Sequence, residues 1–463
     1  MEEENYIVGL EIGTSKICAA AASYTSDGNI VIKSFLEKNI KPEDEILRNG
    51  QIDTVQKTVE IVDELLEKMS ESLAINLQDI NINISNAQIE VAVHGGSITK
   101  GSDSRQIVQN DVDKLVEDVR QSFRIKRDRI ILHHTPLDFY VNDVKQDKTI
   151  VGKMGVQIGG DFYFLTTPSD SIENLYYTLS GIKAKVENPG NKTLKIDHLL
   201  VSPLADSFAL LDASIDDKRN GVAIVNIGAD LTEIAVFHKN SLRFFKAIPI
   251  AGNAITNDLC MSFNLSYEEG EKLKKICGIL PSDMVPENEV VVIERNKGLD
   301  PIEILLKNAV LITEWRLKEI AALVKVELVK AGFENNLVNG IILTGGSANF
   351  NAIKDVFVDV LKVKNVRHAK YNAKVDFEDF ENLRKPQYST LIGLLMAHNN
   401  NFDSRVSNKV LRHNPVSLME TMAPKETEKS AAPVKEKTAR PTLKSFFNKI
   451  LGPENMEDQY NDN

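Results

Sequence analysis

Three glycine-containing turns carry the residue types best suited to chemistry in this sequence. The first turn, Gly13-Thr14-Ser15-Lys16, lies between residues 8–12, which are apolar except for Gly9 and Glu11, and the apolar residues 17–20. The second turn, Gly228-Ala229-Asp230, lies in a similar segment, with apolar residues on both sides. Each segment predicts a β-hairpin whose tight turn can aim several backbone N–H groups at an anion. Either hairpin alone is typical of many proteins.

A third turn changes this interpretation. Gly345-Gly346-Ser347 follows the apolar residues 340–344. Beyond it runs a helical pattern with apolar residues at Phe350, Ile353, Val356, Phe357 and Val360. Glycines there permit the backbone to approach a ligand closely, and a helix start adds a positive dipole. Together with the two matched hairpins, this turn predicts a nucleotide held between two duplicated lobes.

The three turns resemble the two phosphate loops and the adenosine motif of the actin, Hsp70 and sugar-kinase superfamily. Within it, the chain resembles the FtsA family of bacterial cell-division proteins over nearly its whole length. Residues 202–207 and 388–395 resemble the helices that connect the lobes, and residues 248–253 and 271–278 resemble stretches that follow the second phosphate loop. The resemblance implies an α/β chain with a duplicated, actin-like two-lobed ATPase fold and an inserted small α+β subdomain.

ATP, with Mg²⁺, is the cofactor that this resemblance implies. In relatives a glutamate and the lysine three residues later hold the nucleoside, and the matching residues are Glu271 and Lys274. Without the resemblance, an i,i+3 ion pair on a solvated helix is the commoner interpretation of that spacing. The full expected set is Gly13, Thr14, Ser15, Lys16, Gly228, Ala229, Asp230, Glu271, Lys274, Gly345, Gly346 and Ser347.

The first residue of each phosphate loop departs from the superfamily pattern. ATPases of the superfamily usually have aspartate there, which positions magnesium and the attacking water. Here the two positions hold Glu11 and Asn226. Because an amide cannot accept a proton from water, general-base catalysis at Asn226 is not expected. The sequence therefore predicts ATP binding with weak or no hydrolysis, and it identifies no catalytic residue.

Changes in composition and pattern divide the chain. Within the insert we expect strands at residues 89–93, 129–133, 138–141 and 162–166 and a helix at 112–123. In the family this subdomain contacts the next subunit, which implies self-association into filaments. The expected segments are a first lobe (1–85 and 166–200), the insert (86–165), a second lobe (201–398), a linker (399–440), an amphipathic helix (441–452) and an acidic tail (453–463).

A long helical pattern in the second lobe, residues 302–331, has Gly332 as its stop. Its apolar side is expected to include Leu305, Ile312, Ile320, Leu323 and Leu328. It falls in a subdomain, about 246–332, that the resemblance implies is the binding site for the tail peptide of FtsZ. Arg316 and Glu319 match the contact positions. The alternative is an intrahelical Arg–Glu pair, the commoner role of this spacing.

The C-terminal segment carries its own signal. Residues 403–440 contain no aromatic residue, which predicts a disordered linker. Beyond them one helical stripe of apolar side chains is flanked by Lys444 and Lys449. Basic and bulky apolar residues on a tether favour a membrane-targeting helix, the alternative being a helix that docks in a partner groove or on its own body. The stripe consists of Leu443, Phe446, Phe447, Ile450 and Leu451.

Composition excludes several other classes of protein. A net charge of −11 argues against sequence-independent nucleic-acid binding. The eight histidines and three cysteines show no metal-ligand spacing, so no metal site of the protein's own is expected. The acidic start and the absence of an 18-residue apolar run predict a cytoplasmic chain.

The resulting hypothesis is an actin-like, ATP-binding adaptor. It tethers FtsZ filaments to the cytoplasmic face of the membrane at the division septum, contacts membrane lipids, and works with other division proteins. Two rivals stay open. One is a phosphotransferase of the sugar-kinase branch, and the other is a pilus-assembly actin-like adaptor.

Overall fold

The computed structural model describes residues 6–397 except 78, 102, 147–148, 184–193, 212–215, 296–299 and 335. The chain divides into two units, Met1–Thr421 and Met422–Asn463, and every described residue belongs to the first. The predicted linker, amphipathic helix and acidic tail lie outside the described residues. The same holds for the predicted membrane contacts Leu443, Lys444, Phe446, Phe447, Lys449, Ile450 and Leu451.

The first-lobe sheet has the strand order β13-β6-β1-β2-β3-β21. Strands β1, β2 and β3 form an antiparallel meander, and β6 and β13 continue the sheet in parallel from β1. Its strands are β1 (Tyr6–Ile12), β2 (Lys16–Tyr24), β3 (Ile30–Asn39), β6 (Asp79–Ile84), β13 (Lys195–Val201) and β21 (Val375–Asp376).

The second-lobe sheet repeats this plan in the order β16-β15-β14-β19-β20. Strands β14, β15 and β16 form the meander, and β19 and β20 extend it in parallel from β14. The two predicted hairpins, β1–β2 and β14–β15, therefore occupy equivalent positions in the two sheets, which confirms the duplication. The strands are β14 (Val222–Ile227), β15 (Thr232–His238), β16 (Ser241–Ile248), β19 (Ile341–Thr344) and β20 (Val366–His368).

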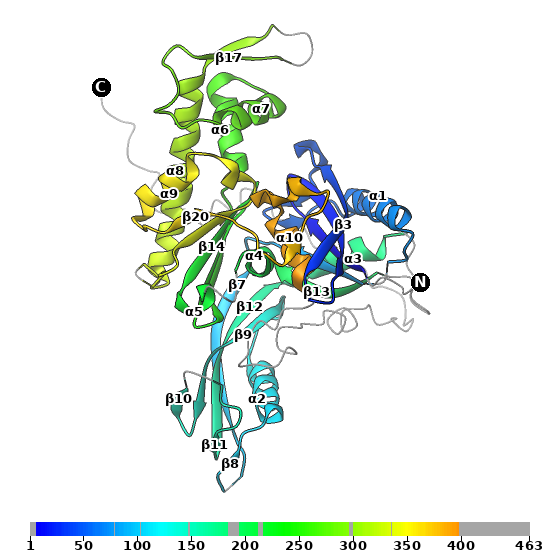
Figure 1. Cartoon of the computed structure of the whole chain (residues 1–463), viewed down its shortest axis with the longest axis vertical. Helices are drawn as coiled ribbons and strands as arrows, with labels where there is room; N and C mark the ends of the chain where they lie inside the picture. The colour runs from blue at the N-terminus through cyan, green and yellow to red at the C-terminus, as the bar shows by residue number, and fades with distance from the viewer. Residues whose placement is uncertain are drawn as a thin grey trace, which may run out of the picture. The chain divides into compact units, whose positions relative to one another are not determined.

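Helices cover both faces of the first-lobe sheet. Helix α1 (Val55–Leu73) packs on β2 and β3, whereas α10 (Ser389–Met396) packs on β1 and β2 (Figure 1). Because strand side chains alternate between faces, Gly9 and Glu11 share one face, and a Cβ at Gly9 would lie 3.3–3.4 Å from Leu395 and Leu394 of α10.

In the second lobe, buried residues of the sheet and its helices form one hydrophobic core. The helices of this core are α6 (Gly252–Phe263), α7 (Tyr267–Cys277), α8 (Leu306–Lys330) and α9 (Ile353–Leu361), whereas the short α5 (Asp217–Asn220) packs on β15.

The connecting helices α4 (Ser202–Leu210) and α10 cross at very short range. Every residue of both helices is buried. A Cβ at Gly393 would lie 1.9 Å from the carbonyl oxygen of Ala205, so only glycine fits at this crossing.

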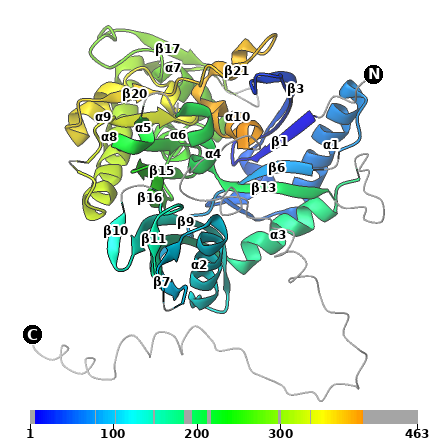
Figure 2. The same cartoon turned by 60° about the horizontal axis from the view of Figure 1, so that its bottom comes forward.

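The insert forms its own sheet, β10-β9-β12-β7, with α2 packed on β7 and β12 (Figure 2). A separate hydrophobic core joins α2 to these strands. The predicted helix and most predicted strands are present, although their bounds differ. They are β7 (Glu90–Thr99), α2 (Gln109–Ser122), β9 (Arg129–Val141), β10 (Val144–Gln146) and β12 (Gln157–Pro168).

Two expectations about these elements were wrong. The predicted strands 129–133 and 138–141 are one strand, β9, because a bulge opposite Phe162 accommodates Pro136 without ending the pairing. The predicted helix 302–331 starts later, because residues 302–305 form β18, which pairs with β17 (Val290–Ile293). Leu305 is consequently 45% exposed and does not line the helix. Gly332, with φ +75°, ends α8 as predicted.

The remaining elements are short, apart from α3. Across the described residues, no helix is long and apolar enough to cross a membrane. These elements are α3 (Ser169–Ser180), β4 (Leu47–Arg48), β5 (Gln51–Ile52), β8 (Arg105–Gln106), β11 (Met154–Gly155), β18 (Ile302–Leu305) and the 3-10 turns Pro42–Asp44, Gly346–Asn349, Glu381–Arg384 and Pro386–Tyr388.

We predict that Gly393→Ala destabilises the protein by about 3 kcal/mol, because the added methyl group forces α4 and α10 apart. Urea unfolding measures this change. Gly346→Ala is the matched control, since a Cβ there meets no atom within 4 Å. Equal stability of the two variants would contradict the close crossing.

Candidate functional site

The first predicted loop is the tight turn between β1 and β2. The N–H of Gly13 donates to the carbonyl oxygen of Lys16 at 3.0 Å, which closes the turn around Thr14 and Ser15. The loop is held from behind by Asn83 of β6, whose Oδ1 accepts the N–H of Ile12 at 2.8 Å. The four predicted residues of this loop therefore lie together at the end of β1.

Lys16 has an unusual environment. Its ammonium lies 3.6 Å from the ring centroid of Tyr388, and the Tyr388 hydroxyl donates to Glu37 at 3.0 Å. The Lys16 Nζ is buried and has no hydrogen-bond partner among the described residues. Desolvation raises the pKa of the neighbouring Glu11 carboxyl, while Lys16 acts to lower it. A buried ammonium with unused donors is chemically ready for an anion.

The second predicted loop joins β14 to β15 and is bound to the start of α6. The N–H of Gly228 donates to the Leu231 carbonyl at 2.9 Å, and the N–H of Gly252 donates to the Gly228 carbonyl at 3.1 Å. The side chain of Asn253 donates to Asp230 at 2.6 Å. The segment after β16 therefore fixes Gly228, Ala229 and Asp230, as expected for a loop that must keep its shape.

Lys274 of α7 contacts the start of α6, next to the second loop. Its ammonium donates to Thr256 at 2.8 Å and to the Gly252 carbonyl at 3.3 Å, and it pairs with the Glu271 carboxylate. Burial lowers the pKa of Lys274, although Glu271 acts in the opposite direction. The pair is thus an i,i+3 ion pair, but a half-buried one that connects α7 to α6.

The third predicted turn completes this cluster. The hydroxyl of Ser347 donates to the Gly228 carbonyl at 3.4 Å. A Cβ at Gly252 would lie 2.9 Å from the Ser347 Oγ and 3.7 Å from the Lys274 Nζ, so three segments converge around one glycine. The structure differs from the sequence prediction in one respect, because Gly346 and Ser347 belong to a 3-10 turn, Gly346–Asn349, and α9 begins only at Ile353.

Two buried acids in this region were missed by sequence reasoning. Asp206 on α4 accepts hydrogen bonds from Ser389, Thr390 and Asn226 at 2.7–2.9 Å. Burial raises the pKa of Asp206 to about 7 despite these bonds. The available signal was that Asp206 is the one charged residue of this helix.

Glu233, next to the second loop on β15, is the second missed acid. One of its carboxylate oxygens accepts the Ser85 hydroxyl at 3.0 Å, whereas Oε1 is buried without a partner among the described residues. Ser85 also shares a 2.7 Å hydrogen bond with Ser202, so the network joins β15 to the segment after β6 and to α4. Burial raises the pKa of Glu233 to about 8.

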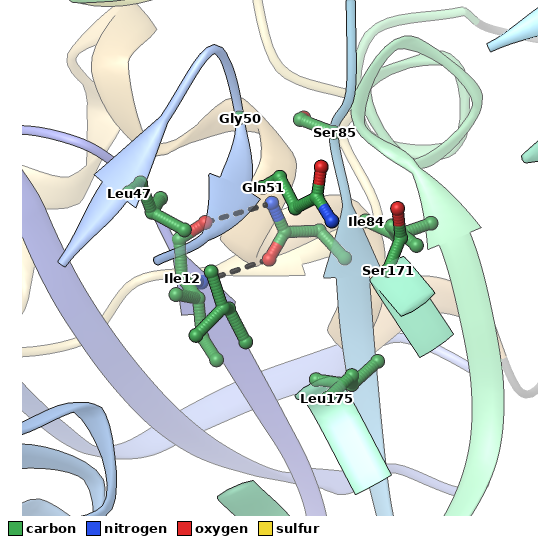
Figure 3. Close-up of a pocket in the computed structure, with 10 residues that line it drawn as sticks. Ile12, Leu47, Gly50, Gln51, Ile84, Ser85, Ser171 and Leu175 are labelled. Atoms are coloured by element: carbon green, nitrogen blue, oxygen red, sulfur yellow. Dashed lines mark hydrogen bonds between the residues drawn. The ribbon is translucent and has the colours of Figure 1, made fainter. Parts of the chain in front are cut away.

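A small cavity lies behind the first loop, beside the end of β1. Its lining includes Ile12, Gly50, Ser85 and Leu175, which converge from four segments (Figure 3). The volume of about 20 Å³ holds about one water molecule. Because ligand pockets are usually at least 300 Å³, this cavity is not the expected nucleotide site.

The predicted partner site lies on α8, apart from the turns. Arg316 donates to both carboxylate oxygens of Asp258 on α6, at 2.6 and 2.8 Å, and also pairs with Glu319. Asp258 is the first cause of the raised pKa of Arg316. The intrahelical pair is therefore present, but Asp258 is the main partner. Trp315 beside it is 63% exposed.

Within the described ranges, no group of three or more His, Cys, Asp or Glu side chains could hold a metal ion.

The chain is similar to known proteins in sequence and in fold. Residues 223–393 match the family model described as cell division protein FtsA. A relative of that name from Borreliella burgdorferi is 26% identical over 419 residues, covering 89% of this chain and 96% of the relative. Another, from Escherichia coli K12, is 26% identical over 400 residues and covers 85% and 90%.

A solved structure, the PilM-PilN type IV pilus biogenesis complex, is similar in fold. The TM-score is 0.58 at 15% sequence identity, over 84% of this chain and 97% of that chain. At this identity the likeness concerns the fold alone.

Two matching sheets, crossing helices between them and turns at equivalent strand ends define an actin-like two-lobed protein. Within that class, residues 223–393 and the relatives show that the chain is similar to proteins named cell division protein FtsA.

The raised pKa of Glu233 predicts that stability falls as pH rises. The folded state keeps the proton up to pH about 8, whereas an unfolded glutamate releases it near pH 4.3. The stabilising contribution of Glu233 is therefore complete below about pH 4 and is lost as the pH rises to about 8, by about 1.4 kcal/mol per pH unit at most.

Glu233→Gln should flatten this dependence in urea unfolding between pH 5 and 8. Glu303→Gln is the control, because Glu303 is exposed on β18. A slope that is the same in all three proteins would contradict the role given to Glu233.

Proposed function

We propose that the chain binds ATP between its two lobes. The observation that carries the proposal is the buried Lys16 ammonium without a hydrogen-bond partner among the described residues, in the turn that resembles the first phosphate loop. The convergence of Gly228, Lys274 and Ser347 around Gly252 supports it from the second lobe. A polyphosphate fits this donor set because it offers charged hydrogen-bond acceptors, which the Lys16 ammonium lacks among the described residues.

In this proposal the first loop and Lys16 bind phosphate, the loop at Gly228 faces it from the second lobe, and Glu271 and Lys274 hold the nucleoside. Glu11 is the acidic side chain that would face Mg²⁺. ATP itself supplies the charged bridge that joins the lobes. Hydrolysis is expected to be weak or absent, because Asn226 cannot act as a general base.

The wider function we propose is that of a cell-division adaptor, supported by relatives named cell division protein FtsA. The adaptor binds FtsZ through the Arg316 surface, assembles into filaments through the insert, and attaches to membrane lipids through residues 441–452. It acts with other division proteins at the cytoplasmic face of the septal membrane. A linker of about 40 residues would span about 35 Å as a flexible coil, and filaments would display many such tethers together.

Lys274→Met should weaken ATP binding by about tenfold, since it removes a charged donor from the nucleoside side of the site. Isothermal titration calorimetry with ATP measures the affinity. Lys272→Met is the control, because Lys272 is exposed on the same helix. The proposal of ATP binding fails if the unmodified chain binds no ATP.

Phe446→Glu should weaken binding to anionic lipid vesicles by about tenfold or more, because one large apolar side chain is lost from the stripe. Co-sedimentation with vesicles measures this, with FtsZ and ATP present or absent. Asn448→Glu adds the same charge outside the stripe and should bind more tightly than Phe446→Glu. Full binding by Phe446→Glu would rule out the membrane helix.

Arg316→Glu should weaken binding of an FtsZ C-terminal peptide by about tenfold while ATP affinity stays unchanged, because it reverses the charge that an acidic peptide needs. Fluorescence anisotropy of a labelled peptide measures this. Asp258→Asn keeps the guanidinium and removes its main partner, so its peptide affinity should equal or exceed that of the unmodified chain. Equal affinity for Arg316→Glu would refute the assignment.

A further inference from the structure

At the end of β14, where the second loop begins, Asn226 forms a closed ring of hydrogen bonds with Asp206 and Thr390. The two amide hydrogens of Asn226 go to Asp206 Oδ2 at 2.8 Å and to Thr390 Oγ1 at 3.3 Å. The Thr390 hydroxyl in turn donates to Asp206 Oδ1 at 2.9 Å. Because both donors of the amide are used inside the ring, the Asn226 side chain has one orientation.

This orientation directs the amide oxygen toward the third turn. A Cβ at Gly345 would lie 2.4 Å from Asn226 Oδ1, so a glycine with φ +86° leaves the space that this oxygen occupies. The oxygen accepts no hydrogen bond from the described residues. Asn226 therefore places a neutral acceptor between the second and third turns.

The ring also decides where negative charge can lie. Aspartates at both 206 and 226 would bring two carboxylates to about 2.8 Å, where both cannot be ionised. The single acid of this pair is Asp206, which is fully buried on α4. The acidic group is therefore on α4, in contact with Asn226, and the side chain at position 226, where the loop begins, is neutral.

We propose that Asp206 is a positioning residue for the nucleotide, which holds the Asn226 amide so that a neutral acceptor, and no carboxylate, faces the phosphates. The inference rests on the proposed ATP binding and adds a residue to it. It also gives a chemical reason for an amide at the start of the second loop, because a carboxylate there would repel the phosphates of ATP and make binding depend on Mg²⁺.

A purely structural role for Asp206 is the competing explanation, since its carboxylate also accepts a hydrogen bond from the Ser389 hydroxyl of α10. Such a role predicts changes in stability without changes in nucleotide affinity. The two explanations are separated by exchanging the acid and the amide, because the double variant Asp206→Asn with Asn226→Asp keeps a donor–acceptor pair but moves the charge to the loop.

The experiment is calorimetric titration of the full chain with ATP, with and without Mg²⁺, together with thermal unfolding. Asp206→Asn and Asn226→Asp should each weaken ATP binding by about tenfold. The exchange should restore affinity to within about threefold when Mg²⁺ is present. Without Mg²⁺ it should stay about tenfold weaker than the unmodified chain, because the carboxylate then faces the phosphates directly.

Further variants keep the test decisive. Asp217→Asn removes another buried acid, bound to Arg367 at 2.7 Å, and should lower stability without changing ATP affinity. If Asp206→Asn does not fold, Thr390→Val and Thr390→Ser replace it. The first should weaken binding by about threefold, and the second, which keeps the hydroxyl, should not.

Two results overturn the inference while ATP binding stands. One is an unchanged affinity in every folded variant of the ring, and the other is an exchange variant that has the same Mg²⁺ dependence as the unmodified chain. If the unmodified chain binds no ATP, the proposed function fails and this inference fails with it.

Discussion

The structure depends on the contact between two helices, α4 and α10, that are buried along their whole length. The backbone of one helix touches the other where Gly393 meets Ala205, which leaves no room for a side chain. Next to this point, Asp206 accepts hydrogen bonds from α10 and β14 together. Such a buried acid is tolerated only with several donors, so the fold and the second loop are fixed by one polar cluster.

The two halves of the candidate site are prepared to different degrees. In the second lobe, the loop at Gly228, the start of α6, Lys274 and Ser347 are already bound to one another. In the first lobe, the Lys16 ammonium has only an aromatic ring and nearby acids. In the proposed complex, ATP would contact a preformed set of groups in the second lobe and a cation without a hydrogen-bond partner in the first, which would be a physical basis for holding the lobes together.

Local sequence was sufficient for the turns and the duplicated plan, because glycine spacing and apolar alternation act over a few residues. It failed where distant segments decide the outcome. Residues 302–305 are a strand only because β17 pairs with them, and Pro136 stays within β9 only because a bulge accommodates it. The partners of Asp206 and Glu233, and Asp258 as the main partner of Arg316, come from other elements, so neither spacing nor residue type could reveal them.

The insert has a hydrophobic core of its own, formed by α2 and the strands around it. Substitutions on the outer surface of this subdomain can therefore accumulate without disturbing the packing on which the loops rely. The surface proposed for self-association can therefore diversify from one lineage to another without altering the turns that are proposed to bind ATP.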